Sequence, residues 1–235
     1  MKICIIGNSH VGSLKRAWEP MTHLHDTHEI VFFADRGRGL NEIDISGDVL
    51  APKTKRLQKS LEFTSGGRKF IDPKEYDFFL VYGLNSTAFF IHPKKHYSSA
   101  VLEQSTVDHV SASLSIKVVE LLRALTNKKI YIGHTPLLAC KALDFKVTFP
   151  AGYLCGLDII NENVYSKINA KMLQQPLDTI VNGRFTHPNL STGSKRLSIG
   201  DKRDDEHHPE NDHGHMNDEF GAKWLSSFLE EISLQ

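Results

Sequence analysis

One stretch decides the fold: Lys2-Ile3-Cys4-Ile5-Ile6-Gly7-Asn8-Ser9-His10-Val11-Gly12-Ser13. Its apolar run has the length of a strand and no polar alternation, which is typical of a strand buried on both faces of a parallel sheet. A helical pattern begins near His10, and its apolar residues recur about every 3.6 positions until Pro20 ends it. Ser9 therefore falls between a buried strand and a helix, at the edge where open parallel sheets bind ligands.

Working outward from this stretch, further apolar runs predict more strands of the same sheet. They cover residues 29–34, 76–82 and 129–132. Helical patterns are expected at about 107–125, around 159–168 and at about 219–232. Strands that alternate with helices predict an α/β domain with a mainly parallel sheet.

The remaining segments fit a single domain that spans residues 1–235. Residues 41–76 predict a small insertion, with a hairpin around Gly66-Gly67. Residues 182–218 are polar and are expected to form mostly loop, and long loops inside compact domains are usually functional or disordered.

Composition excludes several classes of function. The 28 basic and 28 acidic side chains cancel, so no nucleic-acid partner or anionic membrane is indicated. The three cysteines form neither a disulfide framework nor a zinc-binding CxxC pair. No apolar stretch approaches the ~18 residues of a membrane span, and no secretory leader is apparent. We therefore expect no membrane span and a cytoplasmic location.

The candidate catalytic residues follow the ends of the predicted strands. Ser9 follows the first strand, Gly37 and Gly39 follow the second, and Asn85 follows the third. A parallel sheet brings these ends to one edge. The Asn85 amide could donate to a developing oxyanion, together with the backbone N–H groups of Ser9 and of a loop glycine, either Gly37 or Gly39.

A serine becomes a nucleophile only with a base, and the base needs a group that holds its tautomer. The stretch Asp212-His213-Gly214-His215, just before the last predicted helix, supplies both on one tight turn. The sequence thus contains a complete Ser/His/Asp set and calls for no metal and no cofactor.

The order of these blocks resembles the SGNH (GDSL-like) hydrolase superfamily. The likeness rests on Gly-Asn-Ser after the first strand, glycine after the second, Gly-x-Asn after the third, and Asp-x-x-His before the last helix. It implies a three-layer α/β/α, flavodoxin-like fold. It also implies Ser9 as the nucleophile, His215 as the general base and Asp212 as its partner, with an oxyanion hole formed by Ser9, Asn85 and Gly37 or Gly39.

Two positions depart from the usual motifs of that superfamily. Asn8 stands where the first block commonly has aspartate, and Ser86 stands where the third commonly has it. Neither position carries the implied nucleophile, base or oxyanion donor. The function implied is hydrolysis of an O-acyl ester through an acyl-enzyme, on a small-molecule or glycan substrate such as a carbohydrate O-acetyl ester.

Several alternatives stay open. Acyl transfer on the same triad, or a non-catalytic module that binds a glycan or an anionic ligand, would use the same crevice. Asn8 and Ser9 could simply cap the first helix. Arg36 and Arg38, if free, would favour an anionic substrate. The alternative to a triad in the tail is a divalent-metal cluster built from His207, His208, His213 and His215 with the acidic side chains Asp204, Asp205, Glu206, Glu210 and Asp212.

Two further histidines have ordinary structural interpretations. His10 is expected to be a first-turn helix residue rather than a second base. His134, at the end of the fourth strand, is expected to be structural. The sequence does not specify the oligomeric state.

Overall fold

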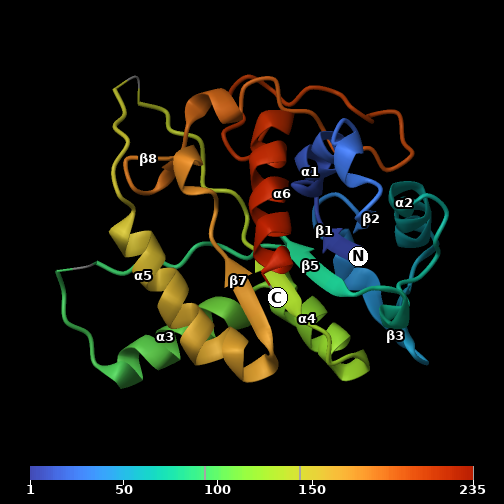
Figure 1. Ribbon diagram of the computed structural model, residues 1–235, viewed down its shortest axis with the longest axis horizontal. Helices are drawn as coiled ribbons and strands as arrows, with labels where there is room; N and C mark the ends of the chain where they lie inside the picture. The colour runs from blue at the N-terminus through green and yellow to red at the C-terminus, as the bar shows by residue number, and fades with distance from the viewer. Residues whose placement is uncertain (93, 143, 235) are drawn as a thin grey trace.

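The computed structural model describes residues 1–92, 94–142 and 144–234. At its centre is a parallel sheet of five strands in the order β2-β1-β5-β6-β7. They are β1 (Lys2–Gly7), β2 (Glu29–Ala34), β5 (Phe78–Tyr82), β6 (Ile130–Gly133) and β7 (Ala170–Leu173). Helices cover both faces of the sheet (Figure 1), so the predicted three-layer α/β/α fold is confirmed.

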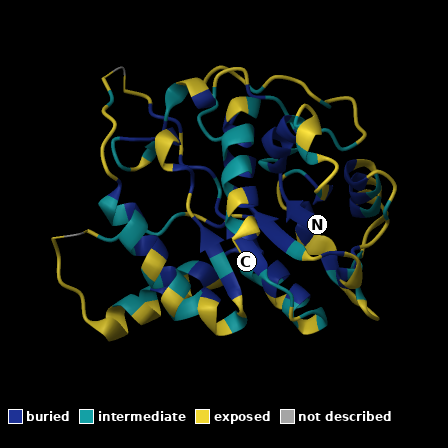
Figure 2. Cartoon of the chain, in the orientation of Figure 1, coloured by how far each residue is buried: buried dark blue, intermediate teal, exposed yellow. Residues whose placement is uncertain are grey.

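Alternate residues of the strands supply two separate cores. Ile3 and Ile5 face α1 (Val11–Trp18) and α6 (Asp218–Ser233). Cys4 and Ile6 face the other layer, which contains α2 (Lys55–Ser65), α3 (Ser99–Ser111), α4 (Leu114–Leu125) and α5 (Ala151–Ile160). This two-sided burial explains the unbroken apolar runs, and Figure 2 shows the strands as the buried interior.

The direction of the chain across the sheet reverses at β1. The chain passes from β1 to β2 on one side and then returns to add β5, β6 and β7 on the other side. In open α/β sheets the ligand crevice lies at such a reversal, beyond the carboxyl ends of the strands. The ends of β1 and β5 are therefore the expected walls of a site.

The predicted hairpin around Gly66-Gly67 is wrong, because residues 55–65 form helix α2. The Thr54 side chain accepts a hydrogen bond from the Leu57 amide at the start of the helix, and Gly66 ends it with φ 74°. Leu57 and Leu61 are one turn apart and are both fully buried. The hairpin of this region lies earlier, in β3 (Ile43–Ser46) and β4 (Val49–Pro52).

The helix expected at 107–125 is two helices, α3 and α4. Ser113 separates them, because its hydroxyl accepts from the Ile116 amide and so starts α4. Helix α5 continues through a π turn (Asn161–Tyr165) and a 3-10 turn (Ser166–Ile168).

Strand β7 was not predicted from the sequence. The Asn161 side chain holds this edge strand: it accepts from the Met172 amide at 2.7 Å and donates to the Met172 carbonyl at 2.9 Å.

The tail between β7 and α6 is mostly loop, as expected. It contains a short pair of strands, β8 (Ile180–Val181) and β9 (Phe185–Thr186). Single 3-10 turns occur at Thr22–Leu24, Gly39–Glu42, Pro73–Glu75, Leu177–Thr179 and Pro188–Leu190. None of the helices in the described ranges is both long and apolar enough to cross a membrane.

Candidate active site

Ser9 lies at the carboxyl end of β1, where its hydroxyl meets a residue from the other end of the chain. Its Oγ is 3.0 Å from Nε2 of His215. His10 is the N-cap of helix α1 and makes no side-chain cap bond, so the interpretation of Ser9 as a helix cap is wrong, whereas Oδ1 of Asn8 accepts from the His10 amide at 3.3 Å. The Ser9 amide has no acceptor among the described residues. Ser9 thus presents both a hydroxyl paired with an imidazole and a free backbone donor.

Asp212 orients the imidazole of His215. Its Oδ2 is 2.9 Å from His215 Nδ1, and its Oδ1 accepts from the amides of Gly214 at 2.8 Å and His215 at 3.0 Å. Burial by itself would raise the pKa of Asp212, but these hydrogen bonds lower the pKa to about 2. The carboxylate is therefore ionised at neutral pH, and Ser9, His215 and Asp212 form one hydrogen-bonded chain.

The helices that follow these residues fix the distance between them. Helix α1 begins two residues after Ser9, and α6 begins three residues after His215. Arg16 on α1 donates through Nε to Asp218 on α6 at 2.8 Å. Its other nitrogens donate to the carbonyls of Lys195 and Arg196. Ser9 and His215 thus each stand just before one of two helices that pack on each other.

The turn after β5 is strained where it approaches the serine. Gly83, Leu84 and Asn85 all have positive φ, at 73°, 53° and 59°. A Cβ on Gly83 would lie 2.5 Å from Oδ1 of Asn8, so only glycine fits against the β1 turn. Leu84 is buried, and left-handed non-glycine residues cost on the order of 1–3 kcal/mol each. The buried Leu84 side chain fixes this turn against the core. Asn85 is exposed at the carboxyl edge of the sheet.

The two candidate glycines after β2 differ in their surroundings. Gly37 is exposed, has φ 64°, and its amide has no acceptor among residues 1–92, 94–142 and 144–234. Gly39 is buried, and its amide donates to the Arg36 carbonyl at 3.4 Å. A Cβ on Gly39 would collide with the Asp35 carboxylate at 1.7 Å, so this glycine is required for packing.

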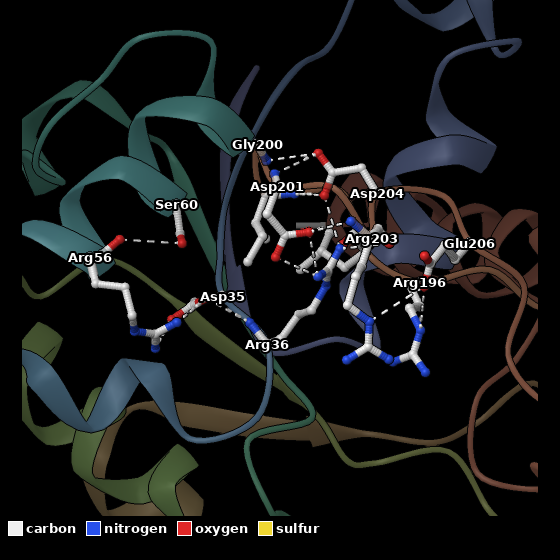
Figure 3. A network of polar contacts seen from close by, with 12 residues as sticks. Asp35, Arg36, Arg56, Ser60, Arg196, Gly200, Asp201, Arg203, Asp204 and Glu206 are labelled. Atoms are coloured by element: carbon white, nitrogen blue, oxygen red, sulfur yellow. Dashed lines mark hydrogen bonds and ion pairs between the residues drawn. The ribbon is translucent and has the colours of Figure 1, made fainter.

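Arg36 binds the loop of residues 197–204, so its guanidinium is not free at the edge of the sheet. It donates to both oxygens of Asp201 at 2.9 and 2.8 Å and to Oδ1 of Asp204 at 2.9 Å. Figure 3 shows Arg36 between Asp201 and Asp204. Its Nε donates to the Leu197 carbonyl at 2.7 Å. Arg36 therefore offers nothing to an anionic substrate, whereas Arg38 is exposed.

His134 is structural, as expected. Its Nε2 lies 2.7 Å from the Tyr153 hydroxyl, which accepts from the Gln175 amide, and its Nδ1 lies 2.6 Å from the Thr135 carbonyl. Burial lowers the pKa of His134 to about 4. The ring is neutral at pH 7 and helps to join β6 to the following segments.

Two other histidines surround the His215 ring. His10 stacks on it with ring centroids 4.8 Å apart, and His208 stacks on it at 3.8 Å. His208 also places Nδ1 3.2 Å from Oδ2 of Asp212. Burial, with the nearby His215, lowers the pKa of His10 to about 3 and that of His208 to about 4. The sequence placed His208 only in a histidine-rich segment, and its spacing carried no sign of a ring stack.

Of the histidine and acidic residues considered for a metal cluster, the described structure brings His208, Asp212 and His215 together. Their ligand atoms lie within 4.8 Å of one another. His207 is exposed, and its backbone pairs with Lys195. His213 accepts a hydrogen bond from the Ala139 amide through its carbonyl. The segment before α6 is thus an ordered loop. Among the described residues it brings three of the candidate metal ligands close together.

Comparison with known proteins identifies the fold alone. No protein-family model and no curated protein sequence matches the chain. Among solved structures, the chain is similar to the periplasmic domain of a lipopolysaccharide acetyltransferase from Salmonella ser. Paratyphi A. The two are 12% identical with a TM-score of 0.50, over 99% of this chain and 83% of that one. The three-layer arrangement is therefore shared with a domain of an acyl-modifying enzyme.

Proposed function

We propose that this protein is a serine esterase of the SGNH type, which hydrolyses an O-acyl ester through an acyl-enzyme. The observation that carries the proposal is the chain from Ser9 Oγ to His215 Nε2 at 3.0 Å and from His215 Nδ1 to Asp212 Oδ2 at 2.9 Å. A serine, a base and an ionised carboxylate within hydrogen-bond reach are the parts that nucleophilic acyl transfer needs.

In the first step Ser9 Oγ bonds to the acyl carbon while His215 Nε2 takes the hydroxyl proton. The tetrahedral intermediate collapses, and the alcohol leaves with that proton. A water molecule then gives a proton to His215 and attacks the acyl-enzyme, which releases the acid and restores Ser9. The negative charge on Asp212 stabilises the imidazolium that forms in each half of the reaction.

The oxyanion donors in this mechanism are the Ser9 amide, the Asn85 side chain and the Gly37 amide. We assign the loop donor to Gly37 because the Gly39 amide already has an acceptor. The left-handed turn at Leu84 and Asn85 supports the assignment of Asn85, since strained backbone persists where the surrounding structure imposes a particular geometry.

A cavity beside the tail loop offers space for the part of the substrate that lies beyond the ester. A cavity of about 550 Å³ adjoins the tail loop, a size that suits a small ligand. Its walls include His208 and His213 with the hydroxyl residues Ser191, Thr192 and Ser194, but none of Ser9, Asp212 and His215. We assign it to the part of the substrate beyond the ester, where hydroxyl side chains match the hydrogen bonds of a sugar.

Transfer of the acyl group to an acceptor alcohol is a second candidate. The structural neighbour is a domain of an acetyltransferase, and the same acyl-enzyme could be intercepted by an alcohol instead of water. Adding a carbohydrate acceptor and measuring acylated product against free acid separates the two reactions.

A panel of p-nitrophenyl esters of increasing chain length tests the proposal, together with a fluorophosphonate probe. We expect turnover of short-chain esters without added metal, an unchanged rate in EDTA, and labelling at Ser9. Folded protein that neither turns over an ester nor takes the label would favour a binding module. Activity lost in EDTA and restored by zinc would favour a metal site in the tail.

A further inference from the structure

The loop that follows β2 is held on two sides by charged side chains. On one side the fully buried carboxylate of Asp35 binds the guanidinium of Arg56 on α2, with Oδ2 2.5 Å from Nη2. On the other side Arg36 binds the loop of residues 197–204 (Figure 3). Gly37, whose amide we assign to the oxyanion hole, directly follows these two anchored residues. The position of its amide therefore depends on both anchors.

Arg36 directs its whole guanidinium into one loop. Nη1 donates to both oxygens of Asp201, and Nη2 donates to Oδ1 of Asp204 and to the Arg203 carbonyl. Nε donates to the Leu197 carbonyl, so each of the five N–H donors of an arginine has an acceptor. The side chain is 19% exposed, and hydrogen bonds that carry charge on both partners are the stronger ones. These bonds fix the loop relative to the end of β2.

Asp204 gives this loop a shape of its own. Its Oδ1 accepts from the Ile199 amide at 2.9 Å, and its Oδ2 accepts from the amides of Gly200 at 2.8 Å and Asp201 at 3.1 Å. The loop is thus closed on the same carboxylate that receives Arg36. A displacement of the guanidinium would be passed to the loop as a unit.

The loop continues into the turn that orients the base. Beyond it the chain pairs with its own earlier part, since the Arg196 amide donates to the Glu206 carbonyl at 2.8 Å and the His208 amide donates to the Ser194 carbonyl at 2.9 Å. Asp212 follows four residues after His208. The paired segment therefore links the loop that Arg36 holds to the carboxylate that orients the imidazole.

We propose that Arg36 is a positioning residue, which holds the oxyanion loop and the general base at a fixed separation. This inference rests on the proposed esterase function. Gly37 is the next residue after Arg36, and Asp212 orients His215, so one guanidinium connects an oxyanion donor with the base. The donors of Arg36 are already bound within the protein, and its effect on the reaction is exerted through these other residues.

Four substitutions separate this role from a contact with substrate. Arg36→Met keeps the apolar stem and removes the charge and the donors. Arg36→Lys keeps the charge without the planar fork of an arginine. Asp201→Asn keeps the shape of one partner of Arg36 and removes its charge. Arg38→Met is the matched control, because Arg38 is the exposed arginine of the same loop.

We expect Arg36→Met to lower kcat by roughly 10- to 100-fold with KM little changed, since a misplacement of about 1 Å can cost that much. Arg36→Lys should recover part of the loss. Asp201→Asn should lower kcat less than Arg36→Met does, because the other acceptors of the guanidinium remain. Arg38→Met should match the wild type.

Two kinetic outcomes would overturn the inference. Wild-type kcat in folded Arg36→Met is the first, and if that variant does not fold, wild-type kcat in both Arg36→Lys and Asp201→Asn has the same meaning. A loss confined to KM is the second, since it would make Arg36 a substrate contact.

Amide hydrogen exchange keeps the test independent of ester turnover. The amides of Gly214 and His215 donate to Asp212 Oδ1, so their exchange reports on how firmly the turn is held. Arg36→Met should speed exchange at both amides relative to Arg38→Met, whereas the amides of β1 should keep their rates. Faster exchange with no ester turnover in the wild type would refute the esterase proposal and leave the link from Arg36 to the turn standing. Unchanged exchange at both amides would overturn the inference and leave the esterase proposal standing where esters are turned over.

Discussion

A Cβ atom on Gly221 would lie 2.2 Å from the carbonyl oxygen of Ser13, so helices α6 and α1 are in direct backbone contact. Helix α1 follows Ser9 and helix α6 follows His215, so the separation of the two helices sets the distance from His215 to Ser9. A glycine at this position is a requirement of the site as well as of the core.

Gly221→Ala should lower both stability and kcat, because backbone atoms cannot move aside as a flexible side chain can. Gly66→Ala is the matched control. It strains a left-handed helix end, with φ 74°, but nothing lies within 4 Å of the added carbon. We expect both variants to lose thermal stability and only Gly221→Ala to lose kcat. Equal kcat in the two variants would show that the helix contact does not set the site.

Ser9→Ala should abolish ester turnover while the free energy of unfolding changes by no more than about 1 kcal/mol, the usual scale for losing a cap bond. The hydroxyl pairs with His215 and not with the start of α1, so little of the fold depends on it. Turnover measured beside urea unfolding checks this. Near-normal turnover in the folded variant would remove Ser9 from the chemistry.

Alanine substitutions of His215, Asp212 and His213 should reduce activity to different extents, in the order set by the contacts of each side chain. His215→Ala should be nearly inactive, since it must move a proton, and Asp212→Ala should be impaired but measurable, since it orients and supports the ring. His213→Ala should keep kcat close to wild type, because the hydrogen bond of His213 with Ala139 is made by its main-chain carbonyl and its side chain lines only the cavity beyond the ester, where a loss would appear in KM. Fluorophosphonate labelling rates give the same ranking independently. Equal losses at His213 and His215 would contradict it.

Asn85→Gly should lower kcat by roughly 10²–10³, the cost of one oxyanion donor, with KM little changed. Glycine accepts the φ of 59° without strain, so stability should not fall. Asn169→Gly is the control, because Asn169 has φ 49° but precedes β7, at the amino edge of the sheet. A main effect on KM would make Asn85 a substrate-positioning residue instead.

Stability should fall with acid over the range set by the buried histidines. Burial lowers the pKa of His10 to about 3 and of His134 to about 4, while an unfolded histidine titrates near 6.5. Between these values the unfolded chain binds more protons, so stability rises with pH and is lost as pH falls from about 6.5 toward 4. Urea unfolding as a function of pH measures the slope.

His134→Asn tests the contribution of one ring to that slope. The variant should be less stable than wild type at neutral pH and should show a shallower dependence on pH, because one proton no longer distinguishes the folded from the unfolded state. His23→Ala, on an exposed 3-10 turn, should leave the slope unchanged. An undiminished slope in His134→Asn would place the acid sensitivity elsewhere.

The sequence predicts the sheet best where burial on both faces leaves a long apolar run. Strands β1, β2, β5 and β6 follow from such runs, whereas the four residues of β7 are interrupted by Lys171. The edge of this strand is held by the Asn161 side chain, a contact that no apolar pattern signals. Helix α2 was mistaken for a hairpin because Gly66-Gly67 looks like a turn, although Gly66 is the left-handed end of a helix.

The candidate site also has a part that the sequence predicts and a part that it does not. Strand ends and the Asp-x-x-His spacing predict which residues meet at the sheet edge, because topology alone brings them there. The environment of His215 depends on ring planes, and no spacing encodes those. The sequence predicts His10 as a helix residue and His208 as a candidate metal ligand, yet both rings stack on the imidazole of His215.

The placement of the hydroxyl and its base at opposite ends of the chain has a consequence for synthesis on the ribosome. Ser9 emerges early, and the strands and helices that follow can begin to assemble around it, since domains fold from the amino-terminal side during translation. His215 is made 206 residues later. Until then a growing chain cannot form the contact between Ser9 and His215, so the proposed mechanism gives it no turnover of esters.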